Sequence, residues 1–519
     1  MRHRIAVPLV TLVAVLGGAV GAVGLVRADS RVATRSVTVD GVPLIEIGPR
    51  GGSRGPGVVV AHGRAASARL MRGFADTLAA RGYVVVLPDF TGHGANATHL
   101  AFGATGVPDV LQDDLEVAVR HLRSRPTVDP GRIGLIGHSM GAAAVTRYAV
   151  AHPDIGATVA ISLRSVDGLP RDAARPRNLL LLVGAAEMRG FRDAAVEGLR
   201  RSDPSARLET TVGDRAAGTA RRAVSVAGVE HISILFSTRA HEEAADWLDA
   251  ALGVPASDVT HPRDRLAPGA LLLLASVLLF VPLARWLLPA PPQPVGSPGG
   301  PPPVRALHAY PGLVVALALG IFGAAVLPTT RLPLSVGGYS AGFFALVGVV
   351  LLLCARFARA GAGAGLLGAR FAVPGAGIRS RTVVAAAVLV AYAVVAVAVP
   401  THLALTSAVP VGARWWLLPV VVACVALFLL GAERLAVGSP WRLPLVLGAT
   451  AVAILVATLA GIGPAFVLLV LPVLVVQLGW YWAWSLVLRR RAAPIWLATV
   501  VGAVVVGWPI ATSMPLGTG

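Results

Sequence analysis

The fold of this chain is decided by residues 133–145, IGLIGHSMGAAAV. An apolar run typical of a strand leads into Gly137-His138-Ser139-Met140-Gly141, and small residues typical of a helix follow. A serine at the centre of such a turn has a cramped backbone that only flanking glycines tolerate. Its hydroxyl is presented at the edge of a sheet beside a helix N-terminus, where it can attack a carbonyl carbon.

Two apolar runs upstream indicate buried strands of the same sheet. Residues 57–63 read GVVVAHG and residues 82–89 read GYVVVLPD. Between them, residues 71–81 place apolar side chains at helical spacing. Continuous apolar strands are typical of a parallel sheet covered on both faces, so this alternation predicts a doubly wound, mostly parallel α/β fold.

With the G-x-S-x-G turn in this context, residues 37–252 resemble the α/β-hydrolase superfamily, in particular its serine esterases and dienelactone-hydrolase-like members. Apolar runs at residues 157–161, 178–184 and 224–229 match the strands that follow the serine in that family. The resemblance implies a catalytic serine, acid and histidine in that order along the chain.

Three residues match these catalytic positions. Ser139 is the expected nucleophile, and His231, in the loop after the last strand, is the expected general base and acid. The strand that delivers the family's acid runs into Glu187, where most relatives carry Asp. Glu187 is expected to orient the imidazole and stabilise its charged form, with Asp193 and Asp214 as alternative acids. The competing interpretations are that Ser139 lies in an ordinary glycine turn, that His231 is a surface histidine and that Glu187 is a solvated carboxylate.

The resemblance also implies an oxyanion hole made of two backbone amides. One belongs to Met140, directly after the serine, and the other to Arg64, directly after His62-Gly63. The Arg64 side chain is expected either to face an anionic substrate or to be solvated. His62 and His93 lie in turns that the family often carries, and we expect both to be structural.

The connection between two of the expected strands is short. Residues 163–177 contain Pro170 and Pro176 and leave no room for the helical lid that many members of the superfamily insert there. This predicts a fold without a lid insertion and a shallow, open site, which favours substrates presented from outside over a sealed small molecule.

The second half of the chain has the composition of a membrane region. The protein is 55% hydrophobic and 14% charged, and the single acidic residue between positions 266 and 519 is Glu433. About eight apolar runs in this half are long enough to cross a bilayer. They lie at residues 268–288, 309–327, 340–354, 383–399, 415–430, 443–460, 464–486 and 494–510.

The N-terminal run, residues 5–26, is also long enough for a membrane anchor, although Val26-Arg27-Ala28 resembles a signal-peptidase site. Either alternative exports the segment that follows. The chain is therefore predicted to comprise a signal anchor or signal peptide at 1–28, an exported hydrolase domain at 29–265 and an all-α transmembrane region at 266–519.

Arginine placement predicts the orientation, because positively charged loops stay in the cytoplasm. If the hydrolase domain faces outward, the arginine-bearing loops at 285–305, 356–381, 434–442 and 489–491 all lie inside. We therefore expect a multi-pass protein of the cell membrane with its hydrolase domain on the extracytoplasmic side.

No carboxylate or histidine falls within the predicted spans, which disfavours a transporter or channel. We expect an anchor or a lipid-facing scaffold, with a specific lipid or partner site as the alternative. The net charge of +18 comes from arginine concentrated in the cytoplasmic loops, which indicates membrane lipid rather than nucleic acid as the partner. Cys354 and Cys424 lie in predicted spans, no Cys/His cluster indicates a metal, and the serine chemistry implies no cofactor.

These observations predict a serine hydrolase, esterase-like, that forms an acyl-enzyme on ester or lipid-like acyl substrates at the outer membrane surface. An acyltransferase or serine peptidase using the same residues is one alternative. A catalytically inactive hydrolase fold, serving as a binding module of a membrane assembly, is the alternative from another class. The sequence predicts no oligomeric state.

Overall fold

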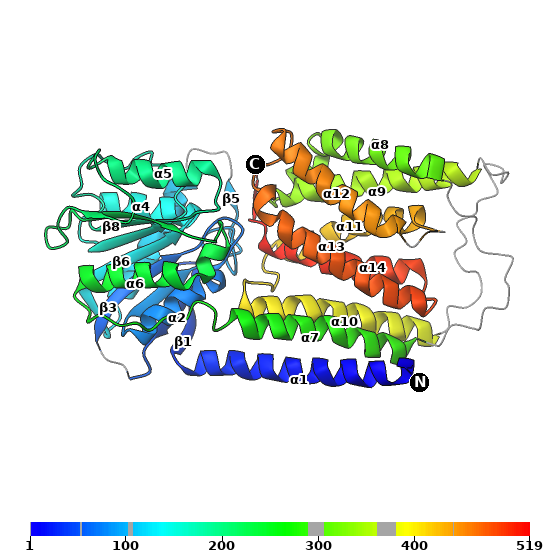
Figure 1. Cartoon of the computed structure of the whole chain (residues 1–519), viewed down its shortest axis with the longest axis horizontal. Coiled ribbons are helices and arrows are strands. Elements are labelled where there is room, and N and C mark those ends of the chain that lie inside the picture. The colour runs from blue at the N-terminus through cyan, green and yellow to red at the C-terminus, as the bar shows by residue number, and fades with distance from the viewer. Residues whose placement is uncertain are drawn as a thin grey trace.

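The computed structural model describes residues 2–51, 54–101, 107–288, 306–360, 380–437, 439 and 441–518. Two parts lie end to end (Figure 1): a sheet flanked by helices, and a bundle of long helices. Most of two arginine-bearing loops, residues 289–305 and 361–379, lies outside the described residues.

The sheet has nine strands in the order β1-β2-β4-β3-β6-β7-β8-β10-β9. Strands from β4 through β10 run parallel to their neighbours, whereas β1, β2 and β9 pair antiparallel at the two edges. The strands are β1 (Ala33–Val39), β2 (Val42–Gly48), β3 (Gly55–Ala61), β4 (Val84–Pro88), β6 (Val128–His138), β7 (Ala157–Ile161), β8 (Leu179–Gly184), β9 (Thr211–Val212) and β10 (Arg221–Val226). The prediction of a doubly wound, mostly parallel sheet is confirmed.

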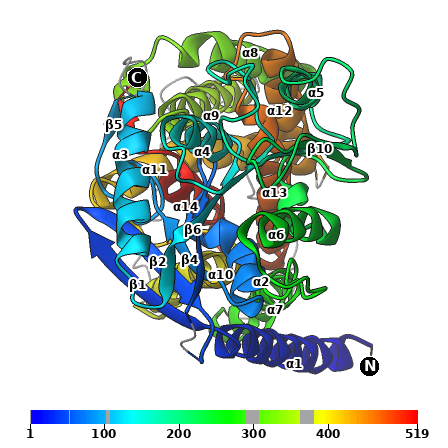
Figure 2. The same cartoon turned by 90° about the vertical axis from the view of Figure 1, so that its left-hand side faces the viewer.

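Helices cover both faces of this sheet (Figure 2): α2 (Arg72–Ala80) and α6 (Thr238–Leu252) on one side, α3 (Val107–Arg123) and α4 (Met140–Ala151) on the other. Helix α5 (Arg189–Arg200) packs beside β8 and β10. Alternate residues of a strand enter opposite cores, so Val58 packs with α2 and α6 while Val59 packs with α3 and α4. This explains why the strands are continuously apolar.

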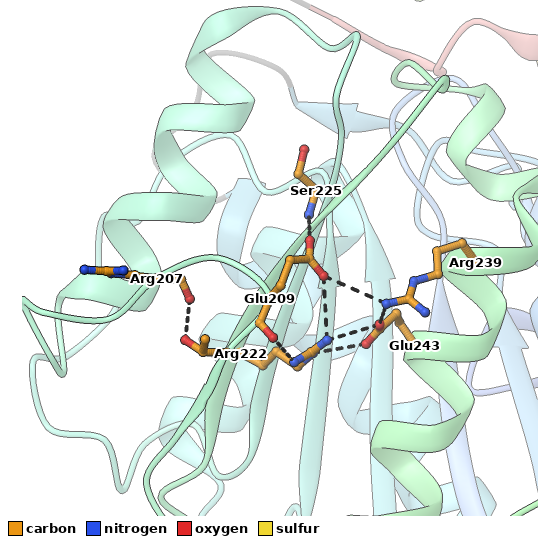
Figure 3. A network of polar contacts seen from close by, with 7 residues as sticks. Arg207, Glu209, Arg222, Ser225, Arg239 and Glu243 are labelled. Atoms are coloured by element: carbon orange, nitrogen blue, oxygen red, sulfur yellow. Dashed lines mark hydrogen bonds and ion pairs between the residues drawn. The ribbon is translucent and has the colours of Figure 1, made fainter.

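A surface network fixes the edge of the sheet near β10 (Figure 3). The Arg222 guanidinium pairs with Glu243 of α6 at 3.1 Å and with Glu209 at 3.6 Å, and Arg239 also pairs with Glu243. The Glu209 side chain accepts the amide of Ser225 at 2.9 Å. These contacts hold the segment before β10 against α6, and thereby fix the strand that leads into His231.

The bundle contains a helix at each of the eight runs predicted from the sequence. These helices are α7 (Leu266–Leu287), α8 (Ala306–Ala324), α9 (Gly337–Ala360), α10 (Ser380–Ala404), α11 (Arg414–Leu435), α12 (Arg442–Leu459), α13 (Val467–Arg490) and α14 (Ile495–Ser513). Within the described residues, eight helices are long and apolar enough to span a membrane: α7, α9 to α14, and the N-terminal α1 (Arg2–Ser30). Helix α8 contributes a shorter apolar segment.

The expectation that the spans contain no carboxylate or histidine is wrong. Helices α10 and α11 continue past the predicted ends, so His402 and Glu433 lie within helices that could span a membrane. Glu433 is buried, Tyr481 donates a 2.7 Å hydrogen bond to it, and Arg489 pairs with it. A carboxylate whose charge and lone pairs are satisfied in this way can remain inside a helical bundle.

Helix α1 lies alongside α7 (Figure 1). The contact is close because two glycines of α1 face Pro268: a Cβ on Gly21 would lie 2.6 Å from the Pro268 carbonyl oxygen, and one on Gly24 would lie 2.7 Å from the Pro268 ring. Small residues allow helices to approach in this way in membranes.

Candidate active site

Ser139 occupies the turn between β6 and α4 with a left-handed φ of 55°. The flanking glycines are required sterically: a Cβ on Gly137 would lie 2.2 Å from the Gly141 carbonyl oxygen, and one on Gly141 would lie 2.5 Å from that of Ala61. The serine amide donates a 2.8 Å hydrogen bond to Ile161 of the neighbouring strand. A strained, fully supported turn of this kind holds the hydroxyl in one position at the carboxyl ends of the strands.

His231 reaches this serine from the loop after β10. Its Nε2 lies 3.1 Å from Oγ of Ser139, and its side chain is only 5% exposed. The Phe191 ring of α5 packs against the imidazole with centroids 4.5 Å apart. A histidine nitrogen at this distance can take the hydroxyl proton.

Glu187 contacts His231 from the turn after β8. Its Oε2 lies 2.9 Å from Nδ1 of His231, and its other oxygen accepts the hydroxyl of Ser162 at 2.7 Å and the amide of Gly184 at 2.8 Å. The carboxylate is fully buried, and the imidazole, the hydroxyl and the amide that contact it each offer a hydrogen-bond donor. The two donors on Oε1 fix the carboxylate so that Oε2 faces the imidazole.

The two alternative acids lie elsewhere. The Asp193 side chain is 65% exposed and pairs with Arg189 at 3.2 Å on the surface of α5. Asp214 accepts the amide of Ala216 within an exposed turn. The structure therefore brings Ser139, His231 and Glu187 together.

Sequence reasoning missed two residues that position this group. His138 places Nε2 2.9 Å from the His231 carbonyl oxygen, and burial lowers the pKa of His138 to about 3, so its neutral ring donates this hydrogen bond. Ser162, at the end of β7, holds Glu187 as described above. The signal for both was their place at the carboxyl ends of central strands, where neighbouring side chains converge.

The turn at Gly63 to Ala65 lies directly against the serine. A Cβ on Gly63 would lie 3.0 Å from Nδ1 of His138 and 3.2 Å from Cβ of Ser139, tighter than ordinary Cβ contacts, so glycine favours this approach. The turn carries Arg64, and Met140 begins α4 at the other side of the serine. Both residues expected to provide oxyanion amides thus border Ser139, and the first amides of a helix have no partner within it.

The Arg64 side chain follows neither of the two expectations from the sequence. Its Nη2 donates a 2.5 Å hydrogen bond to Oγ of Ser335, between η3 (Pro328–Arg331) and α9. Its guanidinium carbon lies 5.8 Å from the ring centroid of Phe466, just before α13. Arg64 therefore contacts the membrane region.

His62 and His93 support the surrounding turns. His62 donates from Nδ1 to the Gly63 carbonyl at 2.7 Å and accepts the Phe90 amide at Nε2. His93 lies 3.0 Å from the Thr91 carbonyl. Burial lowers the pKa of both imidazoles, so they are neutral hydrogen-bonding groups that fix the loops.

The ends of the membrane helices cover the edge of the sheet at the carboxyl ends of its strands, where Ser139 lies. Ser67 shares a 2.9 Å hydrogen bond with Thr406 after α10, and the buried Arg414 of α11 donates to the Gly92 carbonyl at 3.2 Å. The C-terminal strand β11 (Gly517–Thr518) pairs with β5 (Leu100–Ala101). The connection between β7 and β8 contains no helix, as expected, yet the site is not shallow and open because the bundle takes the place of a lid.

A partly enclosed cavity of about 370 Å³ lies between the two parts. On the hydrolase-like side it is lined by Ala65, Leu70, Ile232 and Phe236. Ala65 follows Arg64 and Ile232 follows His231 in the chain, so the cavity borders the two loops that flank the serine. Within the described residues, no group of three or more His, Cys, Asp or Glu side chains is arranged to hold a metal ion.

Comparison with known proteins finds a family match and similar solved structures for the part of the chain that contains the sheet. Residues 55–168, which include the serine turn, match the family described as serine aminopeptidase, S33. A structure of a hypothetical protein from Pseudomonas aeruginosa is 15% identical, with a TM-score of 0.35 over 43% of this chain and 95% of that chain. A predicted CIB-like hydrolase from Thermoplasma acidophilum is 16% identical, with a TM-score of 0.34 over 42% of this chain and 98% of that chain. None of the curated proteins matches the chain.

Proposed function

Because this chain joins an α/β-hydrolase domain to a multi-pass membrane region, we propose that it is a membrane-anchored serine hydrolase. It acts through an acyl-enzyme on ester or lipid-like acyl substrates at the outer face of the membrane. The single observation that supports this most strongly is the unbroken series of contacts from Ser139 Oγ through His231 to Glu187.

In the proposed reaction, the Ser139 oxygen attacks the ester carbonyl carbon while Nε2 of His231 takes the hydroxyl proton. The carbonyl oxygen becomes an oxyanion, which the amides of Met140 and Arg64 stabilise. His231 then gives its proton to the leaving alcohol as the carbon–oxygen bond breaks, which leaves the acyl group on Ser139. Water, activated by the same imidazole, releases the acid and restores the serine.

Glu187 has two roles in this scheme. It holds the imidazole with its proton on Nδ1, so that Nε2 is free to act as a base, and it stabilises the imidazolium formed after proton transfer. Its two further donors, the Ser162 hydroxyl and the Gly184 amide, fix the carboxylate in orientation.

The distribution of arginine supports an extracytoplasmic hydrolase domain. Arg285, Arg434, Arg442 and the run 489–491 lie at or near the helix ends remote from the sheet (Figure 1). Positively charged ends face the cytoplasm, so the sheet faces outward. The close packing of α1 on α7 favours a retained anchor over a cleaved signal peptide.

Two other functions remain as alternatives. The matched family's description names an aminopeptidase, and the same three residues would serve peptide hydrolysis or acyl transfer with a different acceptor. A binding module without activity would require the serine to be unreactive.

The test is labelling of the full-length chain, reconstituted in vesicles, with a short-chain fluorescent fluorophosphonate that reacts with activated serines. We expect labelling of the native protein, and its loss in Ser139→Ala and His231→Ala. Ser165→Ala, which removes an exposed serine, is the matched control and should label normally. A folded native protein that does not label would overturn the proposal, whereas cleavage of aminoacyl amides but not esters would favour the peptidase.

A further inference from the structure

The cavity between the sheet and the bundle extends deep into the membrane region. Along α13 its lining runs from Val467, at the end near the sheet, to Trp480. At the helical rise of about 1.5 Å per residue this is a depth of about 20 Å, more than half the thickness of a bilayer's hydrocarbon core. The cavity therefore connects the border of the catalytic loops with the level of lipid tails.

The walls of this cavity are mostly apolar, and two of the hydroxyl groups that line it are hydrogen-bonded within the protein. Ser340 of α9 donates its hydroxyl to the Val336 carbonyl at 3.0 Å, and Thr458 of α12 donates to the Ile454 carbonyl at 2.8 Å. These hydroxyls are thus satisfied within the backbone of their own segments. Apart from Gln477 and the Trp480 indole, whose N–H has no hydrogen-bond partner in the described structure, a hydrocarbon chain can occupy such a space without leaving these polar groups unpaired.

The cavity also reaches the outer surface of the bundle. Val473 and Val476 of α13 line it, yet they are 56% and 65% exposed. Exposed valines on a spanning helix face lipid, because no other solvent is present at that depth. Leu273 of α7 and Val397 of α10 line the same cavity, so its opening to the bilayer lies between α13 and these two helices.

We infer that the substrate is a long-chain acyl ester of a membrane lipid, which enters sideways from the bilayer between α13 and the α7–α10 pair. Its acyl tail lies in the cavity along α13 while its ester group is delivered between the Arg64 turn and the His231 loop. This deepens the proposed function and rests on it. A cavity open to lipid, closed above by the hydrolase domain and bordering the catalytic loops fits no water-soluble substrate as well.

The inference assigns the membrane region a role in selecting substrates. Each methylene group buried in the cavity strengthens binding of the chain by about fourfold, so a long tail contributes far more binding than a short one. A short-chain ester would use the same serine without needing the cavity.

The test compares two fluorophosphonates, ethyl and hexadecyl, on the full-length protein in phosphatidylethanolamine and phosphatidylglycerol vesicles. The variants are Val473→Trp and Val476→Trp, which place a bulky ring at the exposed opening without altering a buried position. The matched control is Val452→Trp on α12, which is 59% exposed and does not line the cavity.

We expect both α13 variants to slow hexadecyl labelling by about tenfold, the effect of losing contact with a few methylene groups, with ethyl labelling unchanged. Val452→Trp should label as the native protein with both probes. Equal hexadecyl labelling in all variants, or a native protein that reacts with the ethyl probe alone, would overturn the lipid route and leave the hydrolase intact. Failure of the native protein to react with either probe would instead reject the proposed function.

Discussion

Arg64 Nη2 donates a 2.5 Å hydrogen bond to Oγ of Ser335, a residue 271 positions further along the chain. The turn that lies against Ser139 is thereby attached to the segment directly before α9 in the membrane region. The membrane helices therefore fix part of the proposed active site as well as its distance from the bilayer.

Replacement of Ser335 by alanine tests this attachment. Loss of a hydrogen bond to a charged group frees the Arg64 turn, and a small misplacement of an oxyanion donor weakens transition-state stabilisation. We expect kcat for a short-chain ester to fall by about tenfold with KM little changed. Ser335→Thr retains the hydroxyl and should restore most of the rate, whereas an unchanged kcat in Ser335→Ala would show that the turn is held without it.

Glu187→Gln tests the choice of acid. The amide would present a donor to Nδ1 of His231, which favours the wrong tautomer and leaves Nε2 protonated and unable to accept from Ser139. We expect kcat/KM to fall by about 10⁴-fold while the thermal stability changes much less. Asp193→Asn is the matched control, since that carboxylate is exposed and pairs only with Arg189 in the described structure. Comparable losses in both variants would contradict the assignment.

The strongest local patterns gave the sheet and the serine turn correctly. Residues 57–63 and 82–89 fall on β3 and β4, and the run before Ser139 falls on the end of β6, because buried parallel strands carry a dense apolar signal. The antiparallel β1 was missed: ATRSVTV is a mostly exposed edge strand with little apolar content. Its pairing with β2 depends on a tight turn rather than on burial.

Contacts between distant segments could not be predicted from the sequence. Glu187 could be ranked above Asp193 from its place after β8, but its hydrogen bond to Ser162 depends on the packing of two strands. The covering of the site depends on contacts such as Arg64 with Ser335, which leave no local pattern in either segment. The extent of α11 was underestimated because Glu433 is compensated by Tyr481, a residue on another helix.

The stability of the hydrolase domain should depend on pH through His241. This imidazole stacks on Phe74, accepts the Thr77 hydroxyl and donates to the Leu235 carbonyl, and its burial lowers its pKa to about 4. Between about pH 4 and 6.5 the unfolded chain therefore binds a proton that the folded domain does not, so stability falls as the pH is lowered through this window. At pH 4 this difference in proton binding by His241 lowers the free energy of unfolding by roughly 3 kcal/mol relative to neutral pH.

Thermal unfolding of the full-length protein in detergent at pH 7 and pH 4.5 measures this effect. His241→Gln, which cannot titrate, should unfold at a lower temperature than the native protein at pH 7 but lose less on acidification. Phe74→Leu removes the stacked ring and leaves the imidazole, so it should destabilise the protein at pH 7 and keep the native pH dependence. A His241→Gln slope equal to that of the native protein would refute this assignment.

Replacement of two glycines in the bundle by alanine separates the effect of close helix packing on stability from the effect of helix propensity. On α14, a Cβ at Gly502 would lie 2.1 Å from the buried ring of Tyr481, the residue that donates to Glu433, whereas a Cβ at Gly448 of α12 meets no atom within 4 Å. Gly448→Ala should therefore stabilise the protein by about 0.5 to 1 kcal/mol through propensity alone.

Gly502→Ala gains the same propensity but must displace Tyr481, at a cost of about 1 to 3 kcal/mol from overpacking. We expect it to lower the unfolding temperature in detergent, while Gly448→Ala raises it. The double variant Gly502→Ala/Tyr481→Ala removes the displaced ring and leaves only the terminal methyl of Leu429, at 2.8 Å, to shift, so the added alanine should cost much less relative to Tyr481→Ala alone. Equal responses at the two glycines would contradict the close approach of α14 to α13, and with it the packing that buries Glu433.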